Sequence, residues 1–245
     1  MNAIIHFPAK PSACAHSRAG LDCEHCDVRL VAVCSALKHD ELESLGRIAH
    51  TLCFAPKETL FIENDPSDSA YTVTRGVLRL YRVFADGRRQ VVGFLLPGDF
   101  IGLDEGGRHR FAADAITDVS LCHYPKQNFT ALLNDKPHLL KQLYNAAAHE
   151  LIEAREHMMA LGQRSAREKI AWFLIHLRSR WARSRPPSDE LSIPMSRQDI
   201  ADYLGLTIET VSRTFTKLAR EGTIVILPHG VRLADARKIE RLAAA

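Results

Sequence analysis

The chain has 245 residues, of which 46% are hydrophobic and 25% charged, so it can bury a sizeable core, and we expect two cores. No stretch approaches the roughly 20 apolar residues that span a bilayer, which excludes a membrane-spanning protein and a membrane partner. The first residues lack a basic start followed by an apolar run, so nothing suggests export and we expect a cytoplasmic protein.

The net charge of +3 hides an asymmetry between the two parts of the chain. From Arg164 to the end there are 15 Lys and Arg against 9 Asp and Glu, whereas the remainder carries 17 against 20. A basic terminal third is expected of a domain that binds a polyanion, because each neutralised phosphate releases counterions. A solvated charged surface gives the same balance, so charge alone does not decide between them.

The first half of the chain predicts a Cys-rich segment followed by a β-roll. Residues 1–36 are rich in Cys and His and show little periodic pattern. Within a predicted sensor domain over 37–136, the chain from about Leu52 to Lys126 reads as short strands separated by turn signals. Ala85-Asp86-Gly87-Arg88 is a strong hairpin signal. Spacing of this kind predicts an all-β barrel or roll.

A heptad pattern then replaces the strand pattern over 137–163. Apolar residues recur at steps of four and three, which predicts a two-helix contact and so a parallel dimer. A helix packed on its own β-domain is the alternative. The seam consists of Leu140, Tyr144, Ala147, Leu151, Ala154, Met158 and Leu161.

Residues 164–245 predict a winged helix-turn-helix. An amphipathic helix from Arg167 to about Trp181 and a loop over 184–189 precede it. Ser196 is placed to cap a first helix with Asp199 in its first turn, and Gly205 can adopt the left-handed turn conformation. Thr207 can cap a second helix from Ile208 to about Glu221.

The second helix carries side chains suited to DNA. Val211, Phe215 and Leu218 form its buried stripe, which turns Glu209, Ser212, Arg213 and Thr216 outward. An Arg fork can take both acceptors of a guanine, and a Glu can accept from a cytosine amine. A surface salt bridge is the alternative for this Glu and Arg. Residues 222–227 and 231–233 around Pro228-His229-Gly230 predict a β-hairpin wing.

The roll pattern, the long helix and the segment LGLTIETVSR resemble the CRP/FNR family of bacterial transcription regulators, from about Cys23 to Leu242. The resemblance implies an α+β chain with a cyclic-nucleotide-binding-like roll, a dimerisation helix and a winged helix-turn-helix. It also implies that Glu209, Ser212 and Arg213 read a palindrome like TTGAT-N4-ATCAA. We count Thr207, Thr216 and Lys217 among the DNA-binding residues, with Arg185 and Lys217 at most as phosphate contacts.

Two segments bear on what the roll senses. In this family a cyclic-nucleotide pocket uses Gly-Glu-Leu followed by Arg-Ser or Arg-Thr, and here the matching segments are Gly98-Asp99-Phe100 and Arg110-Phe111-Ala112-Ala113. The missing Glu and hydroxyl residue argue against a cyclic nucleotide.

The cysteines offer the better candidate. Cys23, Cys26 and Cys34 form a C-x2-C-x7-C run, and Cys122 ends a predicted strand. Soft thiolates select zinc or iron–sulfur clusters. The spacing looks like the FNR branch of the family, in which these four residues hold an oxygen-labile [4Fe–4S] cluster. We interpret Cys14 as a tail residue, Cys53 as core, and His16 and His25 as exposed.

Three alternatives stay open for these cysteines: a structural zinc site, a thiol–disulfide switch and inert buried thiols. The resemblance to the FNR branch implies that the cluster favours the homodimer. The homodimer places two recognition helices about 34 Å apart on DNA. Family analogy places the RNA polymerase contact in exposed loops of the roll such as Phe84 to Gln90. We find no P-loop, GxGxxG, HExxH or nucleophile elbow, so we expect no enzymatic activity.

Overall fold

The computed structural model describes residues 23, 25–102, 104, 106–186 and 188–244. Two antiparallel four-stranded sheets form the expected roll, with strand orders β1-β8-β3-β6 and β2-β7-β4-β5. Gly87, with φ +83°, closes the β4–β5 hairpin at the predicted turn. The strands are β1 (His50–Phe54), β2 (Thr59–Phe61), β3 (Ser69–Arg75), β4 (Leu78–Val83), β5 (Arg89–Leu95), β6 (Phe100–Ile101), β7 (Ala112–Ala115) and β8 (Val119–Pro125).

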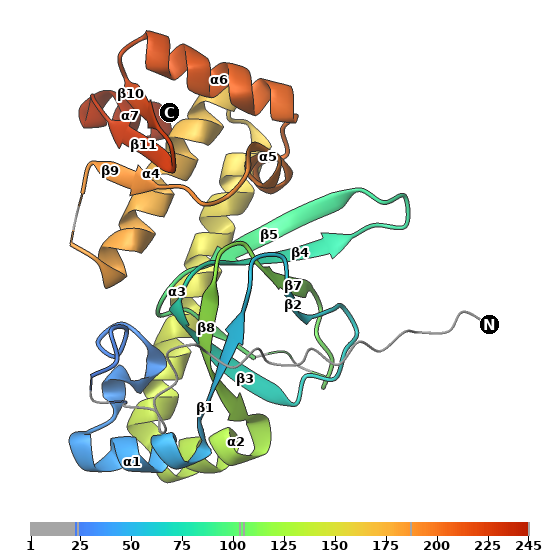
Figure 1. Cartoon of the computed structure of the whole chain (residues 1–245), viewed down its shortest axis with the longest axis vertical. Coiled ribbons are helices and arrows are strands. Elements are labelled where there is room, and N and C mark those ends of the chain that lie inside the picture. Colours follow the sequence, from blue (N-terminus) through green and yellow to red (C-terminus); the bar gives the residue numbers. More distant parts are fainter. Residues whose placement is uncertain (1–22, 24, 103, 105, 187, 245) are drawn as a thin grey trace.

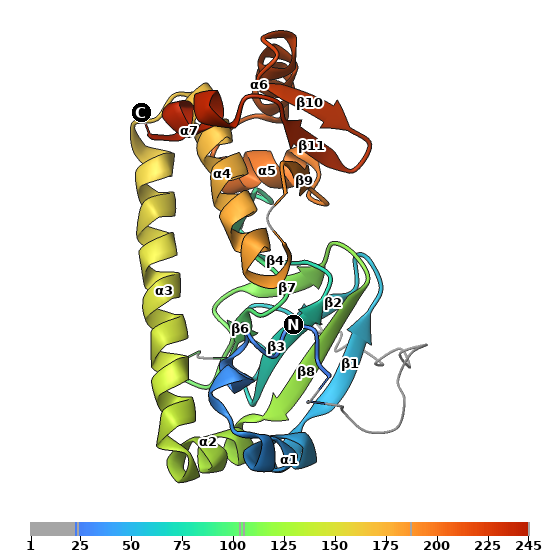
Figure 2. The same ribbon diagram turned by 90° about the vertical axis from the view of Figure 1, so that its left-hand side faces the viewer.

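One long helix connects the roll to the C-terminal part. Helices α1 (His39–Ile48) and α2 (Lys126–Asp135) lie at the end of the roll where α3 begins (Figure 2). Helix α3 (Pro137–Gly162) starts with proline in its first turn, where the missing N–H costs nothing. It runs past the roll to the C-terminal elements (Figure 2). The expected helix over 137–163 is therefore a single element of 26 residues.

The C-terminal part is a helical unit with a small sheet (Figure 1). Its elements are α4 (Ala166–Ser184), β9 (Glu190–Ser192), α5 (Arg197–Leu204), α6 (Ile208–Arg220), β10 (Ile224–Leu227), β11 (Gly230–Leu233) and α7 (Ala236–Ala244). The expected helix-turn-helix and wing are present, and the fold prediction is confirmed.

Two details differ from the sequence expectation. Helix α4 continues through Ser184 and β9 adds a third strand to the wing, where we expected only a loop after about Trp181. Strand β9 pairs with β11, Leu191 opposite Val231, and the Trp181 indole Nε1 donates to the carbonyl of Ser192 at 3.0 Å, which ties the end of α4 to β9. Strand β8 also continues to Pro125, so Cys122 lies in the middle of a strand and not at its end.

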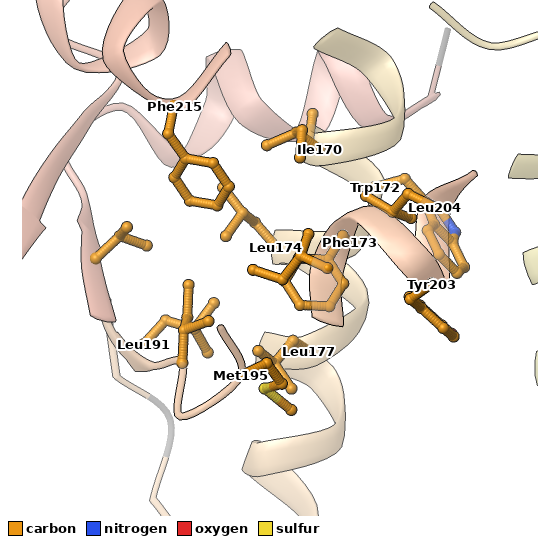
Figure 3. Packing of buried hydrophobic residues seen from close by; sticks show 14 of the residues in the cluster. Ile170, Trp172, Phe173, Leu174, Leu177, Leu191, Met195, Tyr203, Leu204 and Phe215 are labelled. Carbon is orange, nitrogen blue, oxygen red and sulfur yellow. The ribbon is translucent and has the colours of Figure 1, made fainter. Parts of the chain in front are cut away.

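A continuous apolar core joins the roll to the C-terminal unit. Figure 3 shows part of this core, in which side chains of α4, α5 and α6 pack together, among them Phe173, Leu204 and Phe215. Val91 and Phe94 of β5 belong to the same core although they come from the roll. The two units are therefore packed against each other rather than joined by the long helix alone.

A separate core lies where α3 begins. It joins the segment after Cys23 to α1, α2 and β8 through Val28, Val33 and Leu139. The segment that we expected to be unpatterned and flexible is thus packed in the region after Cys23, with a 3-10 turn over Val33–Ala36. Over the described part of the chain, we find no helix with the length and apolar character needed to cross a bilayer.

Burial of His176 on α4 makes stability depend on pH. Its ring stacks on Trp172 with centroids 4.8 Å apart, and burial lowers the pKa of His176 to about 3, assisted by Arg180. Below about pH 6.5, the ordinary value, the unfolded chain therefore binds a proton that the folded chain refuses. The contribution of His176 to folding is complete above that pH and is lost progressively as the pH falls.

We therefore predict that the free energy of unfolding of the natural protein falls as the pH is lowered from 7.5 to 5. The free energy of unfolding of the His176→Gln variant should fall less over the same interval. Urea denaturation at several pH values measures both slopes. The same slope in the variant and in the natural protein would assign the pH dependence to other groups.

Candidate functional site

The helix-turn-helix is built from local hydrogen bonds that the sequence specifies. Ser196 Oγ accepts from the Asp199 backbone N–H at 3.1 Å, and the Asp199 carboxylate accepts in return from the Ser196 N–H at 3.0 Å. Gly205 ends α5 with φ +60°. Thr207 Oγ1 then accepts from the Thr210 N–H at 3.2 Å and caps α6. The turn between the helices is fixed at both ends.

Helix α6 has the two faces that the sequence predicts. Val211, Phe215 and Leu218 are at most 1% exposed and pack on α4 and α5 (Figure 3 labels Phe215). The opposite face leaves Glu209, Ser212, Arg213, Thr216 and Lys217 exposed. This face is free to enter a groove.

The exposed side chains of α6 differ in their hydrogen-bonding state. The backbone N–H of Glu209 itself and the Thr207 hydroxyl lower the pKa of Glu209, so it is ionised at neutral pH and can accept from a base amine. Thr216 Oγ1 donates to the Ser212 carbonyl at 3.0 Å, which leaves it as an acceptor. Arg185 stacks on the Trp181 ring, its Cζ 4.1 Å from the centroid.

The four predicted cysteines lie close together, and the pKa values of Cys34 and Cys122 are raised in part by the other thiols. Cys34 and Cys122 are each 8% exposed and share a core, and Cys23 and Cys26 pack against its edge. Burial raises the pKa of the Cys122 thiol to about 12, and the Cys26, Cys23 and Cys34 thiols add to the effect. The structure therefore brings together thiols from the N-terminal segment and from β8.

Neighbouring backbone holds the cysteine segment in place. The Cys26 carbonyl accepts from the Arg29 N–H at 3.0 Å, which forms a tight turn after Cys26. A side chain at Gly98 would come within 2.8 Å of Val31, so this glycine admits the segment against the roll. Ser35 Oγ accepts from Gln142 Nε2 of α3 at 3.2 Å. The segment therefore contacts both the roll and the long helix.

One positive charge lies beside these thiols. Burial raises the pKa of Cys34 to about 11, with Cys26 and Cys23 adding to it, whereas the Arg29 guanidinium acts in the opposite direction.

Among the described residues, no group of three His, Cys, Asp or Glu side chains is arranged to hold a single metal ion.

The other cysteines and histidines were expected to lie outside this group. Cys14 and His16 are outside the described residues. Cys53 is only half-buried on β1, with its Sγ 3.4 Å from Ser120 Oγ, so the expectation of a core position is wrong. His25 is exposed.

Most of the predicted seam residues lie on the side of α3 that faces away from its own core. Leu139 and Leu143 are buried against the cysteine segment and α2, whereas Tyr144 is 72% and Met158 70% exposed. The remaining seam positions are Leu140 and Leu151, half-exposed, Ala154, exposed, and Ala147 and Leu161, partly buried.

A small cavity of about 230 Å³ lies inside the roll. Apolar side chains line it, and its charged lining is the carboxylates of Asp104 and Glu150. No arginine or lysine is among the described residues that line it. A cyclic phosphate would meet like charge here.

Comparison with known proteins is decisive for the family. Residues 51–136 match the cyclic nucleotide-binding domain model and residues 193–224 match the model for bacterial regulatory proteins of the crp family. The nitrogen fixation regulation protein FixK of Bradyrhizobium diazoefficiens is 49% identical over 96% of this chain and 100% of its own length.

The chain belongs to the CRP/FNR family of bacterial transcription regulators. The transcriptional activatory protein AadR of Rhodopseudomonas palustris is 47% identical over 92% of this chain and 95% of its own length. The solved structure of FixK2 from Bradyrhizobium japonicum superimposes with a TM-score of 0.75 at 34% identity, covering 81% of this chain and 98% of that one. This chain therefore shares the DNA-binding helix-turn-helix of a family of transcription regulators.

Some contacts of this regulator were not predicted. Arg79 and Arg89 of the roll bind Asp199 and Asp202 of α5. The residues of each pair are more than 100 positions apart, and no local pattern marks them. Arg89 and Gln90 thus face α5, so within the loop expected to contact RNA polymerase only the tip, such as Phe84, is exposed.

We predict that Arg213→Ala removes a guanine contact and costs roughly 1–3 kcal/mol per half-site for TTGAT-N4-ATCAA. Lys217→Ala on the same helix is the matched control, because losing a phosphate contact weakens binding to every sequence alike. Affinities for this palindrome and for one with its G·C pairs changed, at fixed salt, distinguish the two. The assignment of Arg213 to base reading fails if its variant keeps the ratio of the two affinities.

Proposed function

We propose that this regulator is an oxygen-responsive dimer in which Cys23, Cys26, Cys34 and Cys122 hold a [4Fe–4S] cluster. The observation that carries the proposal is the gathering of four thiols from two distant parts of the chain beside the start of α3. When bound, such a cluster supplies iron–thiolate bonds that oxygen can destroy. The protein's own residues hold the cluster, join it to α3 and bind DNA.

The donor set fits a soft, positively charged group. Four thiols in a largely apolar site are the ligands that iron–sulfur clusters and zinc prefer. Without a cation, burial and mutual repulsion keep the Cys34 and Cys122 protons on. A bound cationic group would reverse this effect, because it favours the thiolates. Binding of such a group would therefore release the protons of Cys34 and Cys122.

The cysteine segment is coupled to the dimerisation helix by packing. Leu139 and Leu143 of α3 share a core with Cys34 and Cys122, while the neighbouring Leu140 and Tyr144 face outward. Fixing the segment on this core fixes one face of the helix. The other face then meets the same face of a second copy along the heptad seam.

The dimer in turn presents two α6 helices to DNA. In our proposal they read a TTGAT-N4-ATCAA-like palindrome, whose half-sites lie about one DNA turn apart. When the cysteines lose their metal group, the segment loosens from α3 and specific binding falls. The exposed tip of the β4–β5 hairpin at Phe84 is then the surface that we propose for RNA polymerase.

A cyclic nucleotide is not part of the proposal. The roll cavity presents two carboxylates, Asp104 and Glu150, where a phosphate would need a cation. The second candidate is a structural zinc ion on the same four cysteines, because the same thiol chemistry suits zinc. It requires the thiols to move closer together, since no three described side chains are arranged around a single ion.

The first test concerns the ligands. We predict that anaerobically purified protein is brown and contains iron and sulfide, and that Ser at any of the four cysteines abolishes both, because a hydroxyl is a poor substitute for a thiolate. Metal and sulfide analysis with visible spectra measures this. Cys53→Ser is the matched control and should keep both.

If the protein is colourless and contains one zinc ion per chain, the proposed cluster is wrong and the site is a zinc site. A cluster that survives Cys122→Ser would remove Cys122 from the site. Far-ultraviolet circular dichroism of each variant separates the loss of a ligand from the loss of folding.

The second test concerns the seam. Leu151→Glu should give a monomer even without oxygen, because two carboxylates would face each other across the interface. Leu151 is 51% exposed in the single chain, so the fold itself should tolerate the change. Ile152→Glu, at a neighbouring position that is 53% exposed but off the seam, is the control and should remain dimeric. Anaerobic sedimentation gives both masses, and a dimeric Leu151→Glu protein would refute the heptad assignment.

A further inference from the structure

The β4–β5 hairpin of the roll lies directly against α5, the first helix of the DNA-reading element (Figure 1). Arg79 of β4 forms ion pairs with Asp114 of β7 and with Asp199 of α5. Arg89 of β5 reaches Asp199 and Asp202, each at 2.8 Å. The two arginines therefore connect the sensor domain to α5 through two carboxylates. We call these two arginines and two aspartates the interdomain array.

The array is largely withdrawn from water. The side chains of Asp199 and Asp202 are 6% and 12% exposed, and those of Arg79 and Arg89 are 15% and 25% exposed. Charge-assisted hydrogen bonds at such positions are short and directional. Removing one partner leaves the other charge buried and unpaired, which is costly. The array therefore favours one arrangement of the two domains strongly over others.

Apolar contacts continue the same interface. The Phe94 ring of β5 lies 5.1 Å from the Tyr203 ring of α5, centroid to centroid. Gln90 Nε2 donates to the Asp202 carbonyl beside them. Because Val91 and Phe94 belong to the core of the C-terminal unit, the ion pairs sit at the rim of a packed contact. This is an interface of fixed geometry.

The docked arrangement leaves the DNA-reading face of α6 open. Glu209, Ser212 and Arg213 are exposed, while the array lies on α5. Helix α5 packs against α6 through a capped turn, so its orientation sets that of α6. A contact that hid the recognition face would be inhibitory. This one holds α6 in place without covering it.

We infer that Arg79 and Arg89 are positioning residues for DNA recognition, which hold the helix-turn-helix at a fixed orientation on the sensor domain through Asp199 and Asp202. A palindrome demands that two recognition helices enter successive major grooves together. An error in the orientation of α6 therefore costs affinity for the palindrome, whereas non-specific attraction to phosphates needs no fixed orientation. The array thus supports specificity more than total affinity.

Charge reversal at Arg89 and Asp202 tests this inference sharply. Arg89→Asp makes the protein more negative and Asp202→Arg makes it more positive by the same amount. Simple attraction to DNA would move affinity in opposite directions. The positioning role predicts that both variants lower the preference for the palindrome over a scrambled site, by about tenfold each. The double variant, whose net charge is unchanged, should recover part of that preference, because the carboxylate introduced at position 89 would still lie beside Asp199.

Arg88→Asp is the matched control, because Arg88 is next in the chain, lies on the same hairpin and pairs with Asp86 instead of α5. It should keep the natural preference. The inference is overturned if the two single variants change the preference in opposite directions, or if the double variant is no better than the worse single one.

The DNA measurement rests on the proposed palindrome, so a second test measures the coupling of the two units without DNA. Calorimetry should show the roll and the C-terminal unit of the natural protein unfolding together, and Arg89→Asp should separate the transitions. The double variant should rejoin them. If the palindrome is wrong, the natural protein itself shows no preference for it and calorimetry still decides. An unchanged single transition in Arg89→Asp would overturn the inference.

Discussion

The two faces of α3 are the constraint on which the rest of this regulator depends. A helix of 26 residues is about 39 Å long, so one rigid element contacts the cysteine segment at its start and the DNA-reading unit at its end. Its inner face is occupied by the cysteine core near Leu139 and Leu143. Its outer face keeps Tyr144 and Met158 exposed. In our proposal, metal binding and dimerisation therefore act on opposite sides of one helix.

Helix α3 is only one of the connections between the roll and the C-terminal unit. The C-terminal unit also contacts the roll through the core around Phe94 and through the interdomain array. In our proposal, a change at the cysteine segment reaches α6 by two routes, one through the axis of α3 and one across the roll. Both routes are continuous packed contacts, which transmit strain because interiors are close-packed.

The helix-turn-helix could be predicted residue by residue because its determinants are local. Ser196, Gly205 and Thr207 act within three or four positions of themselves, and the buried stripe of α6 follows from helical periodicity. The cysteine group needed a resemblance, since Cys122 is 88 positions from Cys34 and spacing alone does not say which strand it joins. The roll required only the alternation of strand and turn signals.

The rest could not be predicted, for physical reasons. Arg79 and Asp199 are ordinary charged residues, and only the folded chain brings them together. The third strand of the wing pairs with β11 and is joined to α4 by the Trp181–Ser192 hydrogen bond, and both are tertiary contacts. The packing of the cysteine segment depends on Val28 and Val33, whose spacing in a short non-periodic stretch carries no helical or strand signal.

Gly98 has a consequence for how this regulator can change during evolution. Its φ of +100° suits a turn that only glycine adopts easily, and its missing side chain leaves the space that Val31 fills. The absence of a side chain at this position therefore serves two unrelated purposes: it permits the turn of the roll, and it lets the cysteine segment pack against the roll. A lineage that abandons the metal group would lose one reason to keep this glycine but not the other. In our proposal, the position should then persist in descendants whose cysteine segment no longer holds a metal group.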